Sequence, residues 1–329
     1  MLQLDNLDKR IMYELDLDAR IPASKLAKKL LKSKETINFR INRIIQNKVL
    51  KGFYTIFNNS KLGWYYYKVY IKFKNTTPEK EKEIFDFIQS RNHIAYLGSV
   101  EGYFDCIFLV MIKTPKEMSN FMNPFMKQYG EFVQEKEVHT VLTTHRLNQK
   151  FLYKGEISRD LSYGEDIENF KLDEIEKKIL NIISNNARIP LVDIAEKIKV
   201  DHKLVKYRLN KLEREKIILG YTTSPNFDEI GLQFTQINIS LRDPSVKASM
   251  ISYFNFTNKC LFVLELLGRY DLSVEIHVEN NQELKKIIDE FKKQFVHKYN
   301  DYDISTITKE YVMVWSPFFY KISIAPTSN

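Results

Sequence analysis

The sequence predicts an α+β fold of two tandem units, each a winged helix-turn-helix domain followed by a ferredoxin-like βαββαβ domain. Two observations predict it: an internal repeat with constant spacing, and the same succession of helix-period and strand-period segments in both halves. The chain has 329 residues, 44% hydrophobic and 13% aromatic, which suits a folded protein with more than one core.

The repeat is the first observation. Ala19-Arg20-Ile21-Pro22 recurs as Ala187-Arg188-Ile189-Pro190 after 168 residues, and Gly102-Tyr103-Phe104-Asp105 aligns with Gly268-Arg269-Tyr270-Asp271 at an offset of 166. Chance does not easily hold one register over so many residues, so the chain is a duplication. The predicted divisions are a winged helix-turn-helix domain over residues 1–60, a ferredoxin-like domain over 61–150 and a polar linker over 151–170. The second winged helix-turn-helix domain follows over 171–228 and the second ferredoxin-like domain over 229–329.

Each unit is predicted to begin with three helices. In the first unit Leu7, Ile11 and Leu15 form one apolar stripe, and Ser24 is the expected N-cap of a short helix over 25–31. Ser33 then caps a third helix that extends to about residue 47, with Ile37, Ile41 and Ile44 inward; Asp201 is the matching cap in the second unit. Residues 49–56 suggest a β-hairpin wing around Gly52. The alternative is a plain three-helix bundle, because helix-turn-helix patterns are common false positives.

The remaining part of each unit is predicted to be β-α-β-β-α-β, the split βαβ arrangement. In the first unit the predicted elements are 65–73, 79–90, 94–100, 104–112, 116–129 and 132–144; in the second they are 234–241, 245–254, 261–267, 272–278, 282–298 and 304–314. Such a domain leaves one face of its sheet open, so the two domains of one chain, or those of two swapped chains, are expected to pair through these faces.

The distribution of charge indicates the partner. The formal net charge is +8, with twelve basic and six acidic residues in 1–56 and twelve and eight in 170–224, while the rest of the chain has a balance of −2. Positive charge concentrated in the two helical segments is typical of proteins that bind a polyanion. The sequence therefore favours double-stranded DNA as the partner.

At this point the sequence resembles the Lrp/AsnC family of transcriptional regulators. The resemblance rests on Leu4-Asp5-x-x-Asp8-x-x-Ile11, Ala19-Arg20-Ile21, Ser33-x-x-Thr36-Ile37-x-x-Arg40-Ile41, Val49-Leu50-Lys51-Gly52-Phe53 and the Gly102-x-x-Asp105 turn. It implies a DNA-binding domain, a regulatory domain that pairs sheet to sheet and binds a small effector such as an amino acid, and a homodimer or higher oligomer. The fusion of two copies is a departure, as is Asp201-His202-Lys203-Leu204 in place of Ser33-Lys34-Glu35-Thr36.

The third helix of each unit holds the candidate DNA contacts, because an α-helix fits the major groove. Glu35, Thr36, Asn38 and Phe39, with Lys203, Leu204, Lys206 and Tyr207, are assigned to base edges. The cap Ser33 joins the DNA-binding set, and the predicted phosphate contacts are Lys34, Arg40, Arg43 and Lys51, with His202, Arg208, Lys211 and Lys216. The alternative for any one of these is an ordinary solvated surface residue, and Arg40 and Arg208 could instead bridge a carboxylate within the domain.

The turns at Gly102, Tyr103 and Asp105 and at Gly268, Arg269 and Asp271 are the candidate effector sites implied by the resemblance. Taken alone they are hairpin turns, with Gly supplying a positive φ and Asp a local cap. Two other classes of function are compatible with the sequence. One is an architectural DNA-binding protein without an effector; a remote one is a decarboxylase of the haem pathway on a related fold.

The rest of the sequence gives no indication of a catalytic site. No nucleophile motif or phosphate loop is present, so the chain is not expected to be an enzyme, and no cofactor is expected. His139 and His145 share a strand face without a third ligand nearby, so no metal site is expected. With two cysteines, no apolar run of ~20 residues and no signal peptide, we expect a cytoplasmic protein with no membrane contact.

Overall fold

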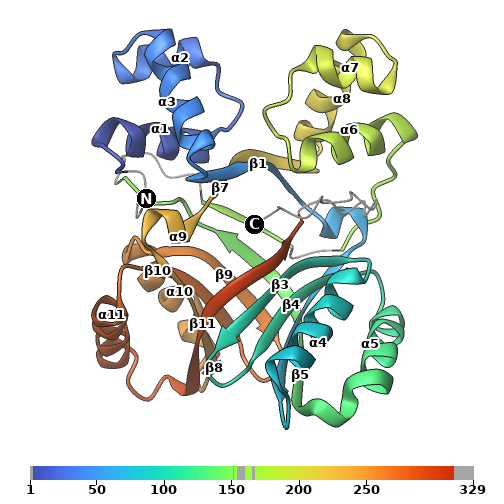
Figure 1. The fold of residues 1–329 in the computed structure, drawn as a ribbon, viewed down its shortest axis with the longest axis vertical. Helices are drawn as coiled ribbons and strands as arrows, with labels where there is room; N and C mark the ends of the chain where they lie inside the picture. Colours follow the sequence, from blue (N-terminus) through green and yellow to red (C-terminus); the bar gives the residue numbers. More distant parts are fainter. Residues whose placement is uncertain (1–2, 151, 154–159, 165–166, 315–329) are drawn as a thin grey trace.

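The computed structural model describes residues 3–150, 152–153, 160–164 and 167–314. Two helical domains lie at one end of the molecule and a β-barrel at the other, with strands β1 and β7 between them (Figure 1). The first helical domain, HTH1, contains α1 (Asn6–Leu17), α2 (Ala23–Leu30) and α3 (Lys34–Gln46). The second, HTH2, contains α6 (Glu174–Ser184), α7 (Leu191–Ile198) and α8 (His202–Arg214).

The helix starts follow side-chain capping. Asp5 caps α1 and Asp173 caps α6, each in a reciprocal capping box with the residue three positions on. Ser33 and Asp201 cap α3 and α8 as predicted, with their side chains accepting backbone N–H groups. The predicted Ser24 cap is wrong: α2 begins at Ala23, because the fixed φ of Pro22 lets its carbonyl accept the first helical N–H groups.

The predicted hairpin wing is also wrong. Residues Leu50–Phe57 form a single strand, β1, which pairs antiparallel with β7 (Ile218–Pro225) of the other unit. Tyr54 lies opposite Thr222 and Thr55 opposite Tyr221 in this two-stranded ribbon. The backbone groups that a hairpin would satisfy locally are thus satisfied across the duplication, so the strand that follows each third helix joins the two units.

The two ferredoxin-like domains have the predicted βαββαβ order. The first contains β2 (Tyr65–Phe73), α4 (Pro78–Ser90), β3 (Ile94–Glu101), β4 (Cys106–Ile112), α5 (Pro115–Tyr129) and β5 (Val133–Arg146). The second contains β8 (Gln233–Leu241), α10 (Lys247–Phe256), β9 (Cys260–Leu267), β10 (Leu272–Val278), α11 (Asn281–Gln294) and β11 (Tyr299–Met313). The sheet orders, β5-β2-β4-β3 and β11-β8-β10-β9, are those of the split βαβ fold.

The two sheets close into one barrel. Strand β3 pairs with β11, β5 pairs with β9, and β2 pairs with β5, so the eight strands form a closed ring. Closure removes the free sheet edges that would otherwise pair with other chains. The domains also pack face to face as predicted, around a core that takes Tyr70 and Phe104 from one unit and Leu264 and Tyr270 from the other.

Short elements complete the chain. The 3-10 turn Ser60–Leu62 follows β1, Gly130–Phe132 precedes β5, Pro244–Val246 precedes α10, and the short helix α9 (Phe227–Ile230) follows β7. Strand β6 (Leu161–Tyr163) pairs with β5, so the segment predicted as a linker adds a strand at the barrel. Residues 151, 154–159 and 165–166 of that segment lie outside the described residues.

Candidate DNA-binding interface

The third helix of HTH1 separates a buried stripe from an exposed one. Ile37, Ile41 and Ile44 are buried in the domain core. Asn38 and Phe39 are on the opposite side, and the Phe39 side chain is 65% exposed, which is costly for a large apolar group without a partner. The exposed stripe of α3 therefore has the composition of a binding surface.

The third helix of HTH2 has the same two stripes. Val205, Leu209 and Leu212 are buried, whereas Tyr207 is 60% exposed. Its exposed neighbours Lys203 and Lys206 carry positive charge, and His202 is exposed at the first position of the helix. Leu204 is half-buried, and its contact with base edges stays a prediction.

The first turn of α3 is held by its cap. The Ser33 hydroxyl accepts the Thr36 N–H and lies 3.0 Å from the Thr36 hydroxyl, so both predicted DNA contacts are engaged in the cap itself. Backbone and Ser33 hydrogen bonds lower the pKa of exposed Glu35 below its ordinary value. Glu35 is thus an ionised acceptor at the N-terminal end of the exposed stripe.

The basic residues in the middle of α3 face α1. Arg40 is 2.5 Å from Asp5 and 3.1 Å from Asp8, and Arg43 forms a further ion pair with Asp8, whose side chain is fully buried. Both guanidinium groups therefore fix α3 against the capping box of α1. The intramolecular bridge that the sequence left open for Arg40 is thus present, and the phosphate contacts of Arg40 and Arg43 stay a prediction.

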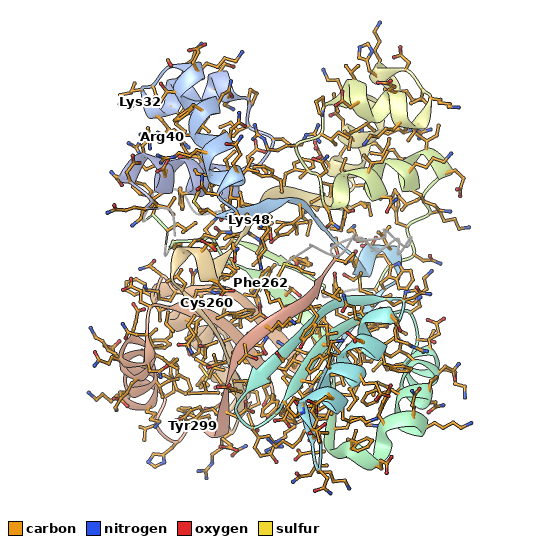
Figure 2. All side chains as sticks on the ribbon, in the orientation of Figure 1. Lys32, Arg40, Lys48, Cys260, Phe262 and Tyr299 are labelled. Atoms are coloured by element: carbon orange, nitrogen blue, oxygen red, sulfur yellow. The ribbon has the colours of Figure 1, made fainter. Side chains whose placement is uncertain are left out.

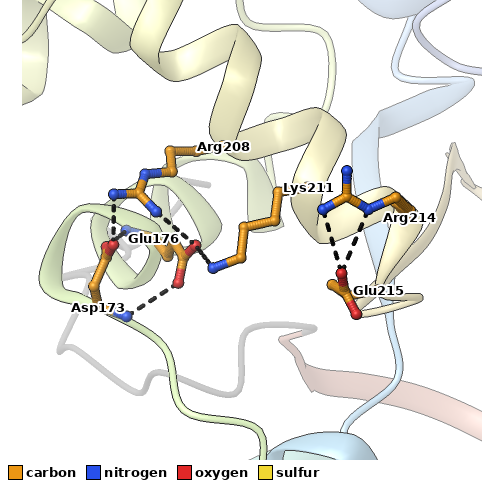
Figure 3. A network of polar contacts seen from close by, with 6 residues as sticks. All are labelled: Asp173, Glu176, Arg208, Lys211, Arg214 and Glu215. Carbon is orange, nitrogen blue, oxygen red and sulfur yellow. Dashed lines mark hydrogen bonds and ion pairs between the residues drawn. The ribbon is translucent and has the colours of Figure 1, made fainter.

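HTH2 repeats this arrangement with different residues (Figure 3). Arg208 is 2.9 Å from Asp173 and 3.3 Å from Glu176, and Lys211 is 2.7 Å from Glu176, which is buried. Arg214, one turn further along α8, pairs instead with the neighbouring Glu215. Arg208 and Lys211 therefore support α8, and their phosphate roles stay a prediction.

The remaining predicted phosphate contacts include residues with and without an ion pair in the structure. Lys51 lies on β1, where its ammonium group is 2.8 Å from Glu310 of the barrel, so it joins the ribbon to the barrel. Lys34 and Lys216 are exposed, and neither forms an ion pair within the described residues. Lys32 and Lys48, which the sequence reasoning missed, are also exposed; Lys32 lies at the outer end of HTH1 and Lys48 beside β1 (Figure 2). The repeat could have identified Lys48, because it aligns with Lys216 and both have a positive φ.

The repeated Ala-Arg-Ile-Pro segment joins the two helical domains. Arg20 donates to the carbonyl of Ala187 at 2.9 Å and of Ile189 at 3.2 Å, and Arg188 donates to the carbonyl of Ala19. Each guanidinium also lies over an aromatic ring of the ribbon, at 5.1 Å for Arg20 and 5.3 Å for Arg188. This reciprocal contact has the form of a two-fold symmetric interface inside one chain.

Comparison with known proteins agrees with this geometry. Residues 4–44 match the family model of the AsnC-type helix-turn-helix domain, and residues 172–218 match that of a winged helix-turn-helix DNA-binding domain. The chain therefore resembles Lrp/AsnC regulators in its helix-turn-helix domains. An uncharacterized HTH-type transcriptional regulator of Pyrococcus furiosus is 28% identical over 141 residues, which is 43% of this chain and 92% of the relative. One of Pyrococcus abyssi is 28% identical over 122 residues, 37% of this chain and 82% of the relative.

Solved structures of one protein match this chain along nearly its whole length. The siroheme decarboxylase NirDL covers 96% of this chain, and this chain covers 95% of it, with a TM-score of 0.66 and 13% sequence identity. At that identity the likeness concerns the fold, and it extends to both units and their arrangement. A tandem pair that closes one barrel is thus a fold that this chain shares with another protein.

The two turns implied as effector sites in the Lrp/AsnC family lie next to each other. Arg269 of the second unit is 5.1 Å from the ring of Tyr103 of the first unit, and both side chains bond to Glu135 on β5. Asp105 accepts the Phe73 N–H at 2.7 Å. Asp271 accepts the Leu241 N–H at the same distance, so both aspartates cap backbone groups.

The glycines of these turns are required by close contacts. A Cβ atom on Gly102 would lie 2.4 Å from the Ile304 carbonyl oxygen, and φ at this residue is +152°. A Cβ atom on Gly268 would lie 2.3 Å from the ring of His139, which stacks on Tyr270 with ring centroids 5.3 Å apart. The turns therefore have a structural role in joining the two units.

The buried histidines of the barrel are neutral. Burial lowers the pKa of His139 to about 4 and that of His277 to about 3. Within the described residues no three metal-ligating side chains come together, and no described helix is long and apolar enough to cross a membrane.

Proposed function

We propose that this chain is a sequence-specific regulator of transcription that binds double-stranded DNA through α3 and α8. The proposal rests mainly on the exposed stripes of α3 and α8, each of which has a large aromatic side chain, Phe39 or Tyr207. The reciprocal hydrogen bonds of Arg20 and Arg188 hold the two helical domains together. The divisions at residues 1–60 and 171–228 are the proposed DNA-binding units.

The geometry divides the proposed contacts into two kinds. Base-edge contacts come from Glu35, Asn38 and Phe39 in HTH1 and from Lys203, Lys206 and Tyr207 in HTH2, all of which are exposed. Exposed basic residues at the helix ends and turns supply the phosphate contacts, namely Lys32, Lys34, Lys48, His202 and Lys216. Arg40, Arg43, Arg208 and Lys211 position the two helices through ion pairs.

The two helices offer different chemistry to the bases. Glu35 accepts hydrogen bonds, for example from a cytosine amine, whereas Lys203 at the matching position donates, for example to guanine. One chain should therefore recognise two half-sites of different sequence. Because Arg20 and Arg188 fix the domains relative to each other, the half-site centres are expected about one helical turn apart, roughly 34 Å, or a multiple of it.

Selection of binding sites from random DNA tests the proposal. The full chain should enrich two unlike half-sites at one spacing, and Lys203→Glu should change the preferred bases in one half-site while the other is unchanged. Lys82→Glu, an exposed residue on α4 of the barrel, is the matched control and should leave the selected site unchanged. Two identical inverted half-sites under one chain, or no enrichment at all, would contradict the proposal.

The assembly and the effector are further parts of the proposal. One chain already contains the pairing that single-copy members achieve as dimers, so a homodimer of this chain would present four helix-turn-helix domains. Arg269 and Glu135 neutralise each other at the family's effector turns, 2.9 Å apart, so these turns offer few free polar groups to a ligand within one chain. An architectural DNA-binding protein without an effector is the alternative within the same class.

A decarboxylase activity is the second candidate, because the fold of NirDL matches along the whole chain. The barrel cavity weighs against it, since its volume of about 100 Å³ has room for only on the order of ten water molecules, several times less than a tetrapyrrole needs. The histidines also argue against acid–base work near neutral pH, because the pKa of His277 in that cavity is about 3. Decarboxylation of siroheme by the purified chain would establish this candidate.

A further inference from the structure

A cavity of about 100 Å³ lies where the barrel meets the β1–β7 ribbon. Its walls come from every barrel strand, and its ceiling includes Tyr54 of β1 and Thr223, Ser224 and Pro225 of β7. Phe262, one of its aromatic wall residues, lies below the ribbon in Figure 2. The cavity therefore touches both strands that carry the helical domains.

The cavity walls include buried polar atoms that have no hydrogen-bond partner within the described residues, among them the Tyr96 hydroxyl, Oε1 of Gln236 and Oε1 of Glu310. The latter two are acceptors only, and the hydroxyl both donates and accepts. Buried polar atoms without partners are costly, so native proteins usually satisfy them with water or a ligand. These atoms therefore favour a ligand that donates hydrogen bonds.

The charged residues of the cavity indicate which charge a ligand can carry. Lys68 is almost fully buried and is already occupied by Ser273 at 2.9 Å and Glu275 at 3.3 Å. Burial raises the pKa of Glu275, and Glu310, whose Oε2 atom is paired with Lys51 at 2.8 Å, places a second carboxyl group on the wall. A ligand carboxylate would meet two acidic groups with no free cation, whereas an amine would meet acceptors.

The size and the walls define the rest of the ligand. A cavity of 100 Å³ has room for on the order of seven to ten water molecules, and hence for a ligand of about ten non-hydrogen atoms. Most of its other walls are aromatic or aliphatic, including Tyr66, Tyr163, Phe227, Phe234 and Leu264. These residues fit an apolar or aromatic body.

We propose that this cavity binds a small organic amine with an apolar or aromatic body, and that the amine is the effector of the chain. The amine N–H groups bond to Gln236 and Glu310, and the body packs against the aromatic walls. Binding changes the ribbon contacts of Tyr54 and Ser224 and thereby the presentation of α3 and α8. The regulatory part of this inference rests on the proposed DNA-binding function, whereas the binding site itself does not.

Isothermal titration of the full chain with three matched compounds tests the site. Phenethylamine should bind with one site per chain, phenylalanine should bind at least tenfold more weakly because of its carboxylate, and 3-phenylpropionate should not bind. Equal binding of phenethylamine and toluene would overturn the role of the amine. Absence of binding by phenethylamine, tyramine and isoamylamine would overturn the site and indicate a cavity that holds water.

Two variants locate the site. Ala95→Leu should fill the cavity and abolish phenethylamine binding, and the matched exposed substitution Ala248→Leu should leave it unchanged. Gln236→Met removes an unpaired acceptor at similar length and should weaken phenethylamine at least tenfold, which keeps the test valid if Ala95→Leu fails to fold. Unchanged binding in both folded variants would place the ligand elsewhere.

DNA binding is measured separately by fluorescence anisotropy with and without phenethylamine. Wild type should change its affinity for DNA by threefold or more when phenethylamine is added, whereas the affinity of Ala95→Leu for DNA should be the same with and without the amine. Amine binding by a chain that binds no DNA would refute the proposed function and the regulatory role while leaving the site intact. DNA binding that ignores a bound amine would refute the regulatory role alone.

Discussion

Removal of Arg146 is expected to destabilise the chain strongly. Its guanidinium lies 2.5 Å from Asp16, and neither side chain is more than 2% exposed. Breaking a buried ion pair typically costs about 3–5 kcal/mol, because the remaining charge is left without compensation. In Arg146→Met, Asp16 keeps hydrogen bonds from Thr222 at 2.7 Å and from the Gln149 N–H at 3.1 Å, so we expect the lower value of about 3 kcal/mol.

Urea unfolding followed by far-UV circular dichroism at neutral pH measures this loss. Lys82→Met is the matched control, since the Lys82–Asp86 pair is exposed and its loss should leave the free energy of unfolding nearly unchanged. The double variant Asp16→Leu/Arg146→Met should be more stable than Arg146→Met alone, because it removes both charges. A loss below about 1 kcal/mol for Arg146→Met would refute the reasoning.

Four further predictions follow from the same geometry. The affinity for DNA should fall steeply between 50 and 200 mM salt, with a log–log slope of about −0.9 per phosphate neutralised, and an unchanged affinity would exclude DNA binding by these domains. Arg43→Ala should lower the urea midpoint because it deprives buried Asp8 of a partner, whereas Lys34→Ala should weaken DNA binding at an unchanged midpoint; the reverse pattern would restore Arg43 as a phosphate contact. Because burial lowers the pKa of His277 from 6.5 to about 3, the unfolded chain binds the proton more tightly, so stability should fall as the pH decreases below 6.5, and His277→Phe should flatten urea midpoints measured between pH 4 and 6.5. Arg20→Ala should broaden the range of half-site spacings that random-DNA selection recovers, and a single unchanged spacing would show that other contacts fix the domains.

The elements that the sequence predicted well are those with local signals. Strand β2 and strand β10 have the predicted bounds, and the buried stripe of α3 is the predicted one, because periodicity and capping depend on neighbouring residues. The pairing of β1 with β7 has no such signal. Gly52 suggested a local turn, but the partner strand lies in the other unit, and only the assembled duplication brings the two together.

The candidate site was predicted in part for the same reason. Exposure of Phe39 and Tyr207 follows from helix geometry alone, whereas the ion pairs of Arg40 and Arg43 depend on how α3 crosses α1. A signal for them was present: Asp5 recurs at the start of the second unit together with the arginine that it contacts. The cavity could not be predicted, because its walls come from every strand of a barrel whose closure joins distant segments.

The Asp16–Arg146 pair has no counterpart in the second unit, which shows that the two halves of a fused chain can differ. The residue that matches Asp16 in the second unit is Ser184, which donates to the Asn181 carbonyl instead. In an assembly of two identical subunits, every substitution occurs twice and must be tolerated on both sides of the axis. Once both copies lie on one chain, each mutation is tried once, so one half can conserve a contact while the other evolves away from it. The same freedom lets α8 diverge from α3, so that a lineage can pass from symmetrical operators to composite ones by single steps.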